Sequence, residues 1–373
     1  MFLALKEMAR AKTRFGLLIA AVGMLVFLIL FQQSLQNGLL TSFVGAIRNQ
    51  SAPVLVYTVD GQRVIQGSVI PAGLEQQVGA NTDVGRIGRI GLGTFTAETG
   101  DGERFDTTVL GYQTPDLGAP TELIAGRFPS APGEAIGSDA DASQGFGLDA
   151  VVTIQPGGYE LVIVGLARDV QLNAGPTLFA NYDDYVDAVR SVNPDALDPL
   201  PNILAVAPAE GVADTELVDS INAISQDLDA LTRTEAADQT PGVSQVRQSF
   251  QVIFLLYGLV IPCVTGLFFL IITFQKSGAL TLLHAIGAPV RRLVTSLLIQ
   301  AVIIIAAGFL IGLAVYAPVS QRRLGGIPLR FETNAVIFWA ILLMILGTGS
   351  SLISAKRVLA IDPIEATTGG ANQ

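Results

Sequence analysis

Residues that could carry out chemistry are few in this sequence, and they form no recognisable catalytic or metal-binding pattern. The acid pairs Asp139/Asp141 and Asp183/Asp184 could act as paired carboxylates, but they lie in a segment rich in acidic residues, where such pairs arise by chance. The single histidine, His284, excludes a histidine metal cage and a Ser-His-Asp triad. No Gly-Lys pair occurs, so the chain lacks a Walker A loop for ATP. We therefore expect no enzyme activity, no catalytic residue, no metal site and no intrinsic cofactor.

Composition indicates instead that the chain is embedded in a membrane. Of its 373 residues, 50% are apolar and only 14% are charged, whereas soluble domains carry about 25% charged residues. The mean hydropathy is +0.52. The net charge of −10 argues against nucleic acid as a partner. Membrane lipid is therefore the first partner that the sequence predicts.

Four apolar stretches are each long enough to cross a bilayer, whose hydrocarbon core of about 30 Å requires about 20 helical residues. They predict transmembrane helices over residues 15–36, 249–275, 293–318 and 335–354. The first stretch follows several basic residues and could also be a signal peptide. Residues 32–37 (QQSLQN), however, lack a small-x-small cleavage pattern, so we favour an uncleaved helix.

Charge predicts the orientation of these helices. The segments 1–14, 276–292 and 355–373 together contain nine Lys or Arg residues and three acidic residues, and positively charged loops stay in the cytoplasm. Both termini are then cytoplasmic, and the short loop 319–334, with three arginines, is an exception on the outside. We expect a multi-pass protein of the cell (plasma) membrane.

The long segment 37–248 is expected to fold outside the cytoplasm. It contains 28 of the 32 acidic residues, ten arginines and no lysine, a composition typical of a water-facing surface. Residues 54–59 and 151–165 predict a strand and a β-hairpin, residues 183–189 and 214–231 predict helices, and the glycine-rich stretch 85–102 is interpreted as turns. The predicted fold class is an integral membrane α-helical protein with four transmembrane helices and a large α+β extracytoplasmic domain between helices 1 and 2.

Two cytoplasmic motifs resemble those of one transporter family. Residues 280–289 (LTLLHAIGAP) are similar to the "LLRAIGA" signature of MacB/FtsX-type ABC transporter permeases, and residues 355–366 (AKRVLAIDPIEA) are similar to the end of those proteins. The N-terminal segment, residues 248–250 (QSF) and residues 268–276 resemble the haem-exporter (HrtB-like) and DevC-like subgroup. One departure is His284, which stands where the family often has arginine.

The resemblance implies how such a chain would work. It implies a homodimer of permeases in a bacterial cell membrane, bound to two copies of a separate ABC ATPase subunit that uses ATP and Mg. Residues 1–14 then form a cytoplasmic amphipathic helix, and residues 276–292 form a coupling helix or loop that inserts into a groove of the ATPase. The coupling residues are expected to be Leu282, Leu283, His284, Ile286, Gly287, Ala288 and Arg291. A simple interfacial helix anchored by arginines is the alternative interpretation of this segment.

The implied function is export of a lipophilic substrate, most readily haem, or of another amphiphile. The alternative is mechanotransmission of the FtsX/MacB type, in which the permease transports nothing and acts on an outer partner. A membrane-anchored receptor is a third class, and the cytoplasmic motifs argue against it. No Asp, Glu, Lys or Arg lies within a predicted span, which argues against a water-filled channel.

A substrate pocket is predicted at the outer ends of spans one and two, where two copies of span one could meet across a two-fold axis. Aromatic side chains would contact the porphyrin, amide and guanidinium groups would orient its propionates, and Tyr257 or Met24 could bind the iron. The predicted residues are Met24, Phe27, Phe31, Gln32, Gln33, Arg247, Phe250, Phe254 and Tyr257. Aromatic residues near span ends also form interfacial belts, and this remains the alternative for any one of them.

Overall fold

The computed structural model describes residues 12–197, 199–275, 290–324 and 327–359, and it divides into two compact units. The first, here called the helical unit, comprises the chain up to Gln36, Gln248–Arg323 and the chain from Leu329 onward. The second, here called the sheet unit, comprises Asn37–Arg247 and Leu324–Pro328. Each unit is described by itself below.

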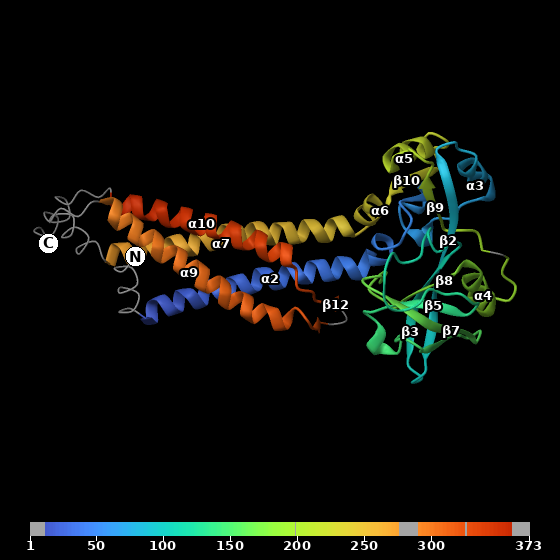
Figure 1. Cartoon of the computed structure of the whole chain (residues 1–373), viewed down its shortest axis with the longest axis horizontal. Helices are drawn as coiled ribbons and strands as arrows, with labels where there is room; N and C mark the ends of the chain where they lie inside the picture. The colour runs from blue at the N-terminus through green and yellow to red at the C-terminus, as the bar shows by residue number, and fades with distance from the viewer. Residues whose placement is uncertain (1–11, 198, 276–289, 325–326, 360–373) are drawn as a thin grey trace, which may run out of the picture. The chain divides into compact units, whose positions relative to one another are not determined.

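Four long helices dominate the helical unit (Figure 1). They are α2 (Lys12–Arg48), α7 (Val243–Gln275), α9 (Val290–Val319) and α10 (Thr333–Leu359). Within the described residues, these four helices are long and apolar enough to cross a membrane. Together with the sheet unit between the first two of them, they confirm the predicted fold class.

Small residues let α2 and α9 pack closely. A Cβ atom added at Gly312 would lie 2.5 Å from the carbonyl oxygen of Gly23, and one added at Gly308 would lie 2.7 Å from the side chain of Val22. Neither position has room for a larger residue, because the partner atoms belong to the backbone or to a buried β-branched side chain. This crossing forms part of an apolar core that also includes Ile304 and Trp339.

A ten-stranded mixed sheet forms the second unit, with the order β10-β1-β9-β2-β3-β8-β5-β7-β4 and with β6 paired to β2 and β7. Parallel pairs join β3 to β8 and β5 to β7, and the other described pairs are antiparallel. The strands are β1 Val54–Thr58, β2 Val84–Thr99, β3 Arg104–Tyr112, β4 Leu123–Gly126, β5 Glu134–Ser138, β6 Val151–Gln155, β7 Tyr159–Ala167, β8 Thr177–Asn181, β9 Ile203–Pro208 and β10 Leu228–Thr232. A separate short pair is formed by β11 (Arg323–Leu324) and β12 (Ile327–Pro328).

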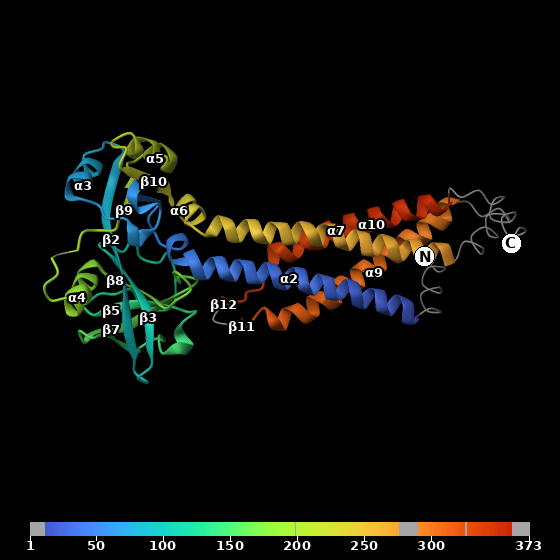
Figure 2. The ribbon, with the colours of Figure 1, turned by 180° about the vertical axis from the view of Figure 1, so that it is seen from behind.

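Four shorter α-helices cover this sheet, and Figure 2 shows the same elements from behind. They are α3 (Ala72–Gly79), α4 (Tyr182–Val192), α5 (Asp214–Asn222) and α6 (Arg233–Gln239). Helix α4 packs on β2 and β3, whereas α5 packs on β10. The last turns of α2 pack into the sheet unit through Leu40, Val44 and Ile47.

The predicted strand at 54–59, the hairpin at 151–165 and the helix at 183–189 are confirmed by β1, by β6 with β7, and by α4. The prediction of turns over 85–102 is wrong, because most of this stretch belongs to the long strand β2. Its glycines serve packing instead. A Cβ atom added at Gly91 would lie 2.5 Å from Cδ1 of Tyr185, so the missing side chain lets the Tyr185 ring lie directly on the strand.

The helix predicted over 214–231 is also wrong in its second half. Helix α5 ends at Asn222, and residues from Leu228 onward form β10. The Asn222 side chain explains the change, because its amide accepts from the Ala230 backbone N–H at 2.7 Å and donates to the Ala230 carbonyl at 3.1 Å. Leu228, whose spacing suggests a continuing helix, instead lies in β10, which pairs with β1. There it lies opposite Thr58.

We expect Gly91→Ala to destabilise the protein by about 1–3 kcal/mol, because the added methyl group would overlap the buried Tyr185 ring. Thermal unfolding followed by circular dichroism measures the loss. Gly100→Ala is the matched control, since no atom lies within 4 Å of a Cβ added there. Equal effects of the two substitutions would contradict this account of β2.

Candidate functional site

The residues predicted on span one form a stripe along α2. Met24, Phe27 and Phe31 recur at intervals of three and four residues, which places them on one side of a helix. Met24 is 61% exposed, and the rings of Phe27 and Phe31 stack with their centroids 5.8 Å apart. Gln32 and Gln33 follow and are half-buried. An apolar stripe that ends in amides could contact a flat amphiphile and orient its polar edge.

The residues predicted on span two face the interior of the helical unit. The rings of Phe250 and Phe254 lie 6.3 Å apart, and Phe254 in turn lies 5.7 Å from Trp339 of α10. Phe254 and Tyr257 both pack against the apolar core of this unit. Trp339, the single tryptophan of the chain, is thus part of the aromatic cluster and was not among the predicted residues. Its position near the N-terminal end of α10 is a signal that the sequence offers.

Phe27, Phe254 and Tyr257 pack against the same apolar core, but the rings of the two aromatic sets are not in direct contact among the described residues. Among the described residues, ring contacts connect Phe27 with Phe31 and connect Phe254 with Trp339, and no ring contact links the first pair to the second. The stripe on α2 is therefore open on the side of Met24. A closed pocket around it would require a second surface.

Arg247, the predicted partner of a propionate, belongs to the sheet unit. Its Nη2 atom donates to Oδ1 of Asp238 at 2.7 Å. The guanidinium of Arg247 would have to be shared with Asp238 if it also oriented a substrate carboxylate.

Most of the predicted ATPase-coupling residues lie outside the described residues. These are Leu282, Leu283, His284, Ile286, Gly287 and Ala288. Arg291 lies in the first turn of α9, which begins at Val290. The coupling role of this segment stays a prediction.

A buried polar cluster that the sequence did not indicate joins three parts of the helical unit. Ser34 on α2 donates to the carbonyl of Arg330 at 2.8 Å and accepts from the Arg330 N–H at 3.0 Å. The hydroxyl of Tyr316 on α9 donates to the same carbonyl at 2.9 Å. Ser34 and Tyr316 are each only 1% exposed. The backbone before α10 therefore obtains its hydrogen bonds from α2 and α9.

One of the acid pairs has a structural role in the sheet unit. Asp184 is buried, and its Oδ1 atom accepts from the Tyr159 hydroxyl and from the Gly133 N–H, each at 2.7 Å. Burial raises the pKa of Tyr159, and the Asp184 carboxylate raises it further, so the phenol remains protonated and can donate. Asp184 thus holds the loop before β5 and the β6–β7 hairpin to α4.

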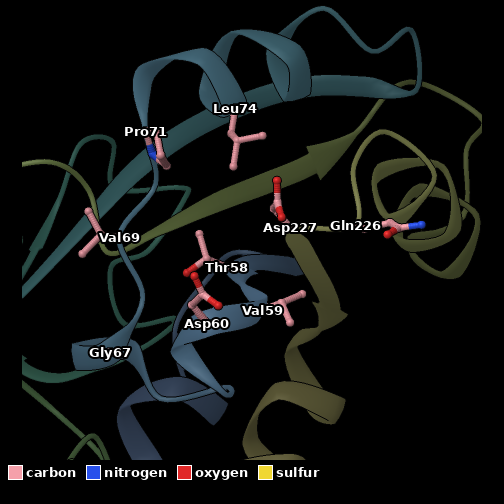
Figure 3. Close-up of a pocket in the computed structure, with 9 residues that line it drawn as sticks. All are labelled: Thr58, Val59, Asp60, Gly67, Val69, Pro71, Leu74, Gln226 and Asp227. Carbon is pink, nitrogen blue, oxygen red and sulfur yellow. The ribbon is translucent and has the colours of Figure 1, made fainter.

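A hollow of about 550 Å³ lies in the sheet unit between β1, α3 and the α5–β10 turn (Figure 3). The side chains of Val59, Val69 and Leu74 form its apolar part, whereas Asp60 and Asp227 supply carboxylates. Two acidic groups disfavour an anionic ligand, so the propionates of haem would be repelled here. Among the residues that the structure describes, no group of three His, Cys, Asp or Glu side chains could hold a metal ion.

The fold and the site therefore define a membrane chain with four spanning helices, an acidic α+β unit, and an apolar aromatic stripe that is exposed at Met24. No protein-family profile matches the chain. A protein of Staphylococcus haemolyticus with the provisional name hemin transport system permease protein HrtB is 21% identical over 369 residues, which cover 99% of each chain. Its namesake from Staphylococcus epidermidis is 31% identical over 112 residues, which span 32% of that relative and 30% of this chain.

Among solved structures, the periplasmic region of MacB from Actinobacillus actinomycetemcomitans aligns with 51% of this chain and 92% of its own, at 10% identity and a TM-score of 0.37. The resemblance to HrtB-like permeases, indicated by the N-terminal segment, residues 248–250 and residues 268–276, is confirmed by the match along the full chain.

We expect Ser34→Ala to lower the stability of the helical unit by about 1–3 kcal/mol, because it leaves the buried Arg330 N–H without its acceptor. Tyr316→Phe should cost less, since Ser34 still donates to the Arg330 carbonyl. Thermal unfolding in detergent micelles compares these variants. The control is Ser320→Ala, which removes a similarly buried hydroxyl that lies just after α9 and donates locally to the carbonyl of Ala317. A Ser34→Ala protein as stable as this control would contradict the proposed role.

Proposed function

We propose that this chain is the permease subunit of an ATP-driven ABC exporter that removes haem from the membrane. The observation that carries the proposal is the likeness of the whole chain to a protein named as a hemin transport permease. It is supported by the stripe on α2, in which Met24 is exposed and the half-buried rings of Phe27 and Phe31 stack, because its apolar character suits a flat amphiphile in lipid. The chain has no charged residue within its predicted spans, so export along an apolar surface fits better than passage through a water-filled channel.

The energy for export would come from a separate subunit. Because the sequence contains no Gly-Lys pair, ATP and Mg would be bound by an ABC ATPase rather than by this chain. Two copies of that ATPase would engage the segment 276–292 of two permease chains. The basic cytoplasmic segments and the acidic segment 37–248 support a location in a bacterial cell membrane, with both termini in the cytoplasm.

A second copy of this chain would complete the substrate site. Within a single chain, only 11% of the most apolar window of α7 is buried, and no atom lies within 4 Å of a Cβ added at Gly258. The α2 stripe is likewise open at Met24. A homodimer in which these faces meet would enclose the stripe, with lipid covering what remains exposed.

Haem in such a site would be bound mainly by apolar contact. Burial of apolar surface contributes roughly 25 cal/mol per Å² before the costs of ordering. The propionates need donors because a carboxylate without a partner is costly to move away from water, and Gln32 and Gln33 supply amides at the end of the stripe. The iron could be bound by Met24, which is exposed, or by Tyr257, which is half-buried in the helical core.

We expect the purified chain to hydrolyse no ATP by itself and to support hydrolysis only when its ATPase subunit is present. The reason is the missing Walker A loop. Turnover is measured with the permease alone, with the ATPase alone and with both. Hydrolysis by the permease alone, above that of a mock purification, would contradict the proposal.

We expect haem titrated into the detergent-purified protein to shift the Soret band saturably. Phe31→Ala and Phe254→Ala should each weaken binding roughly tenfold, because each removes a large apolar contact. Phe128→Ala is the control, since this ring is 40% exposed in the sheet unit and lies outside the predicted spans. Met24→Leu and Tyr257→Phe should change the spectrum only if the replaced side chain binds iron. No saturable shift, or equal affinity of all variants, would refute the pocket.

A further inference from the structure

Two of the helices, α2 and α7, belong to both units of the chain. The residues of α2 after Gln36 and those of α7 before Gln248 are part of the sheet unit, and the remainder of each helix is part of the helical unit. The chain also passes into the sheet unit at Leu324–Pro328, but α2 and α7 are the long helices that continue from one unit into the other. How their ends are held within the sheet unit decides whether they move separately or together.

A single carboxylate oxygen connects the two helix ends. Oδ1 of Asp238 accepts from Nη2 of Arg48, in the last turn of α2, and from Nη2 of Arg247, in the first part of α7, each at 2.7 Å. The three side chains are 33–39% exposed, so these ion pairs contribute little to overall stability. The geometry of these ion pairs matters more than their energy. Without Asp238, the positively charged guanidinium groups of Arg48 and Arg247 would face each other and repel.

The electrostatics agree with this geometry. Partial burial raises the pKa of Asp238, but the hydrogen bond and charge of Arg247, together with those of Arg48, outweigh it and lower the pKa below its usual value. Asp238 is therefore ionised at neutral pH and keeps both arginines paired.

The end of α2 is also fastened to the loop that precedes β8. The backbone of Val44 leaves the helical conformation, with φ −133° and ψ 16°. The carbonyls of Ser42 and Phe43 then accept from Ala174 and Asn173 at 2.8 and 3.0 Å. A Cβ atom added at Gly45 would lie 3.0 Å from the backbone of Asp169, so this contact is close. A movement of the end of α2 would therefore also displace the loop before β8.

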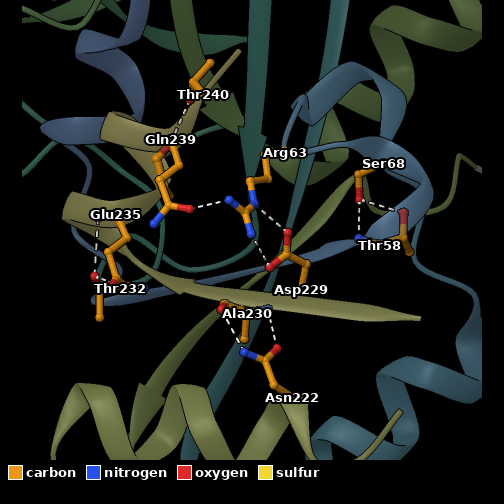
Figure 4. A network of polar contacts seen from close by, with 11 residues as sticks. Thr58, Arg63, Ser68, Asn222, Asp229, Ala230, Thr232, Glu235, Gln239 and Thr240 are labelled. Atoms are coloured by element: carbon orange, nitrogen blue, oxygen red, sulfur yellow. Dashed lines mark hydrogen bonds and ion pairs between the residues drawn. The ribbon is translucent and has the colours of Figure 1, made fainter. Parts of the chain in front are cut away.

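Helix α6, which carries Asp238, is also held by contacts of Gln239 and of its first turn (Figure 4). Gln239 accepts from Nη1 of Arg63, and Nε of Arg63 donates to Asp229 of β10 at 2.7 Å. A capping box between Thr232 and Glu235 fixes the start of the helix. Asp238 thus projects from a helix that is anchored to the sheet. A displacement of Arg48 or Arg247 would therefore be transmitted through α6 to β10.

We propose that Asp238 is a positioning residue that ties α2 to α7 where both helices enter the sheet unit, so that the two helices move as one. The proposal rests on the proposed function only in that ATP hydrolysis by the partner subunit would supply the movement. Asp238 touches no substrate in this account. It acts by holding Arg48 and Arg247 together.

The first experiment measures whether Asp238 holds α2 and α7 together, and it does not depend on transport. Cys263, which is exposed on α7, is replaced by serine, and spin labels are placed at Phe43→Cys on α2 and Ser244→Cys on α7, both at exposed positions. In the full-length protein, Asp238→Ala should clearly broaden the distance distribution between the labels. Asp238→Asn should give an intermediate width, and Asp238→Glu should restore the narrow distribution.

The matched control removes another exposed ion pair of the same unit. Glu98→Gln breaks the pair between Glu98 and Arg104, which lies between β2 and β3, and should leave the distribution unchanged. Melting temperatures of all variants show whether any of them is unfolded. If Asp238→Ala is unfolded, the distance distribution of Asp238→Asn decides the test. Equal widths for Asp238→Ala, Asp238→Asn and the unsubstituted protein would overturn the proposal.

The second experiment measures coupling in liposomes that contain the permease and its ATPase subunit. Asp238→Ala should hydrolyse ATP at nearly the normal rate but export roughly fivefold less haem per ATP, because the helix movement is no longer shared. An unchanged ratio would contradict a coupling role. If the unsubstituted complex exports no haem, the proposed function fails, while the spin-label distances still decide whether Asp238 ties the helices.

Discussion

The absence of water around four long apolar helices is the constraint on which the structure of this protein depends. In a bilayer every backbone N–H and C=O must find a partner within the protein, and helices achieve this by themselves except near their ends. The cluster of Ser34, Tyr316 and Arg330 meets that need where the chain approaches α10, because two side chains from other helices bond its backbone. The close α2–α9 crossing at Gly23, Gly308 and Gly312 follows from the same constraint, since helices in lipid associate through close packing rather than through the hydrophobic effect.

The same constraint separates the chemistry of the two units. Charged side chains are confined to the segments outside the predicted spans, and the segment 37–248 carries most of the acidic residues. Within this segment the charged side chains stabilise the fold. Asp184 accepts a hydrogen bond from Tyr159, and Asp238 accepts from two arginines. The charged side chains of the sheet unit therefore act as contacts between its secondary-structure elements.

The features that were predicted correctly are those that depend on patterns of residues close together in the sequence. Apolar runs predict the four helices, and alternation with a Pro-Gly-Gly turn predicts the β6–β7 hairpin. The errors arise where a distant partner decides the structure. Glycines in β2 look like turn residues until Tyr185 is seen lying on Gly91, and the helical spacing after Asn222 is overridden by pairing with β1. Trp339 beside Phe254, and Asp238 between Arg48 and Arg247, depend on contacts between residues far apart in the chain, which no local pattern reveals.

The aromatic residues of the spans illustrate how one composition can serve two purposes. An interfacial belt places rings at the lipid boundary, yet Phe254 packs against the core that contains Trp339, so its ring stabilises the helical unit whatever else it contacts. On α2, Phe27 packs against the same core, whereas Met24 is 61% exposed, so the accessible apolar surface of the α2 stripe lies at Met24. The hollow of the sheet unit has the opposite character, because Asp60 and Asp227 would repel the carboxylates of a porphyrin. The apolar surface at Met24 and the acidic hollow of the sheet unit therefore differ in the chemistry of the ligands that they could accept.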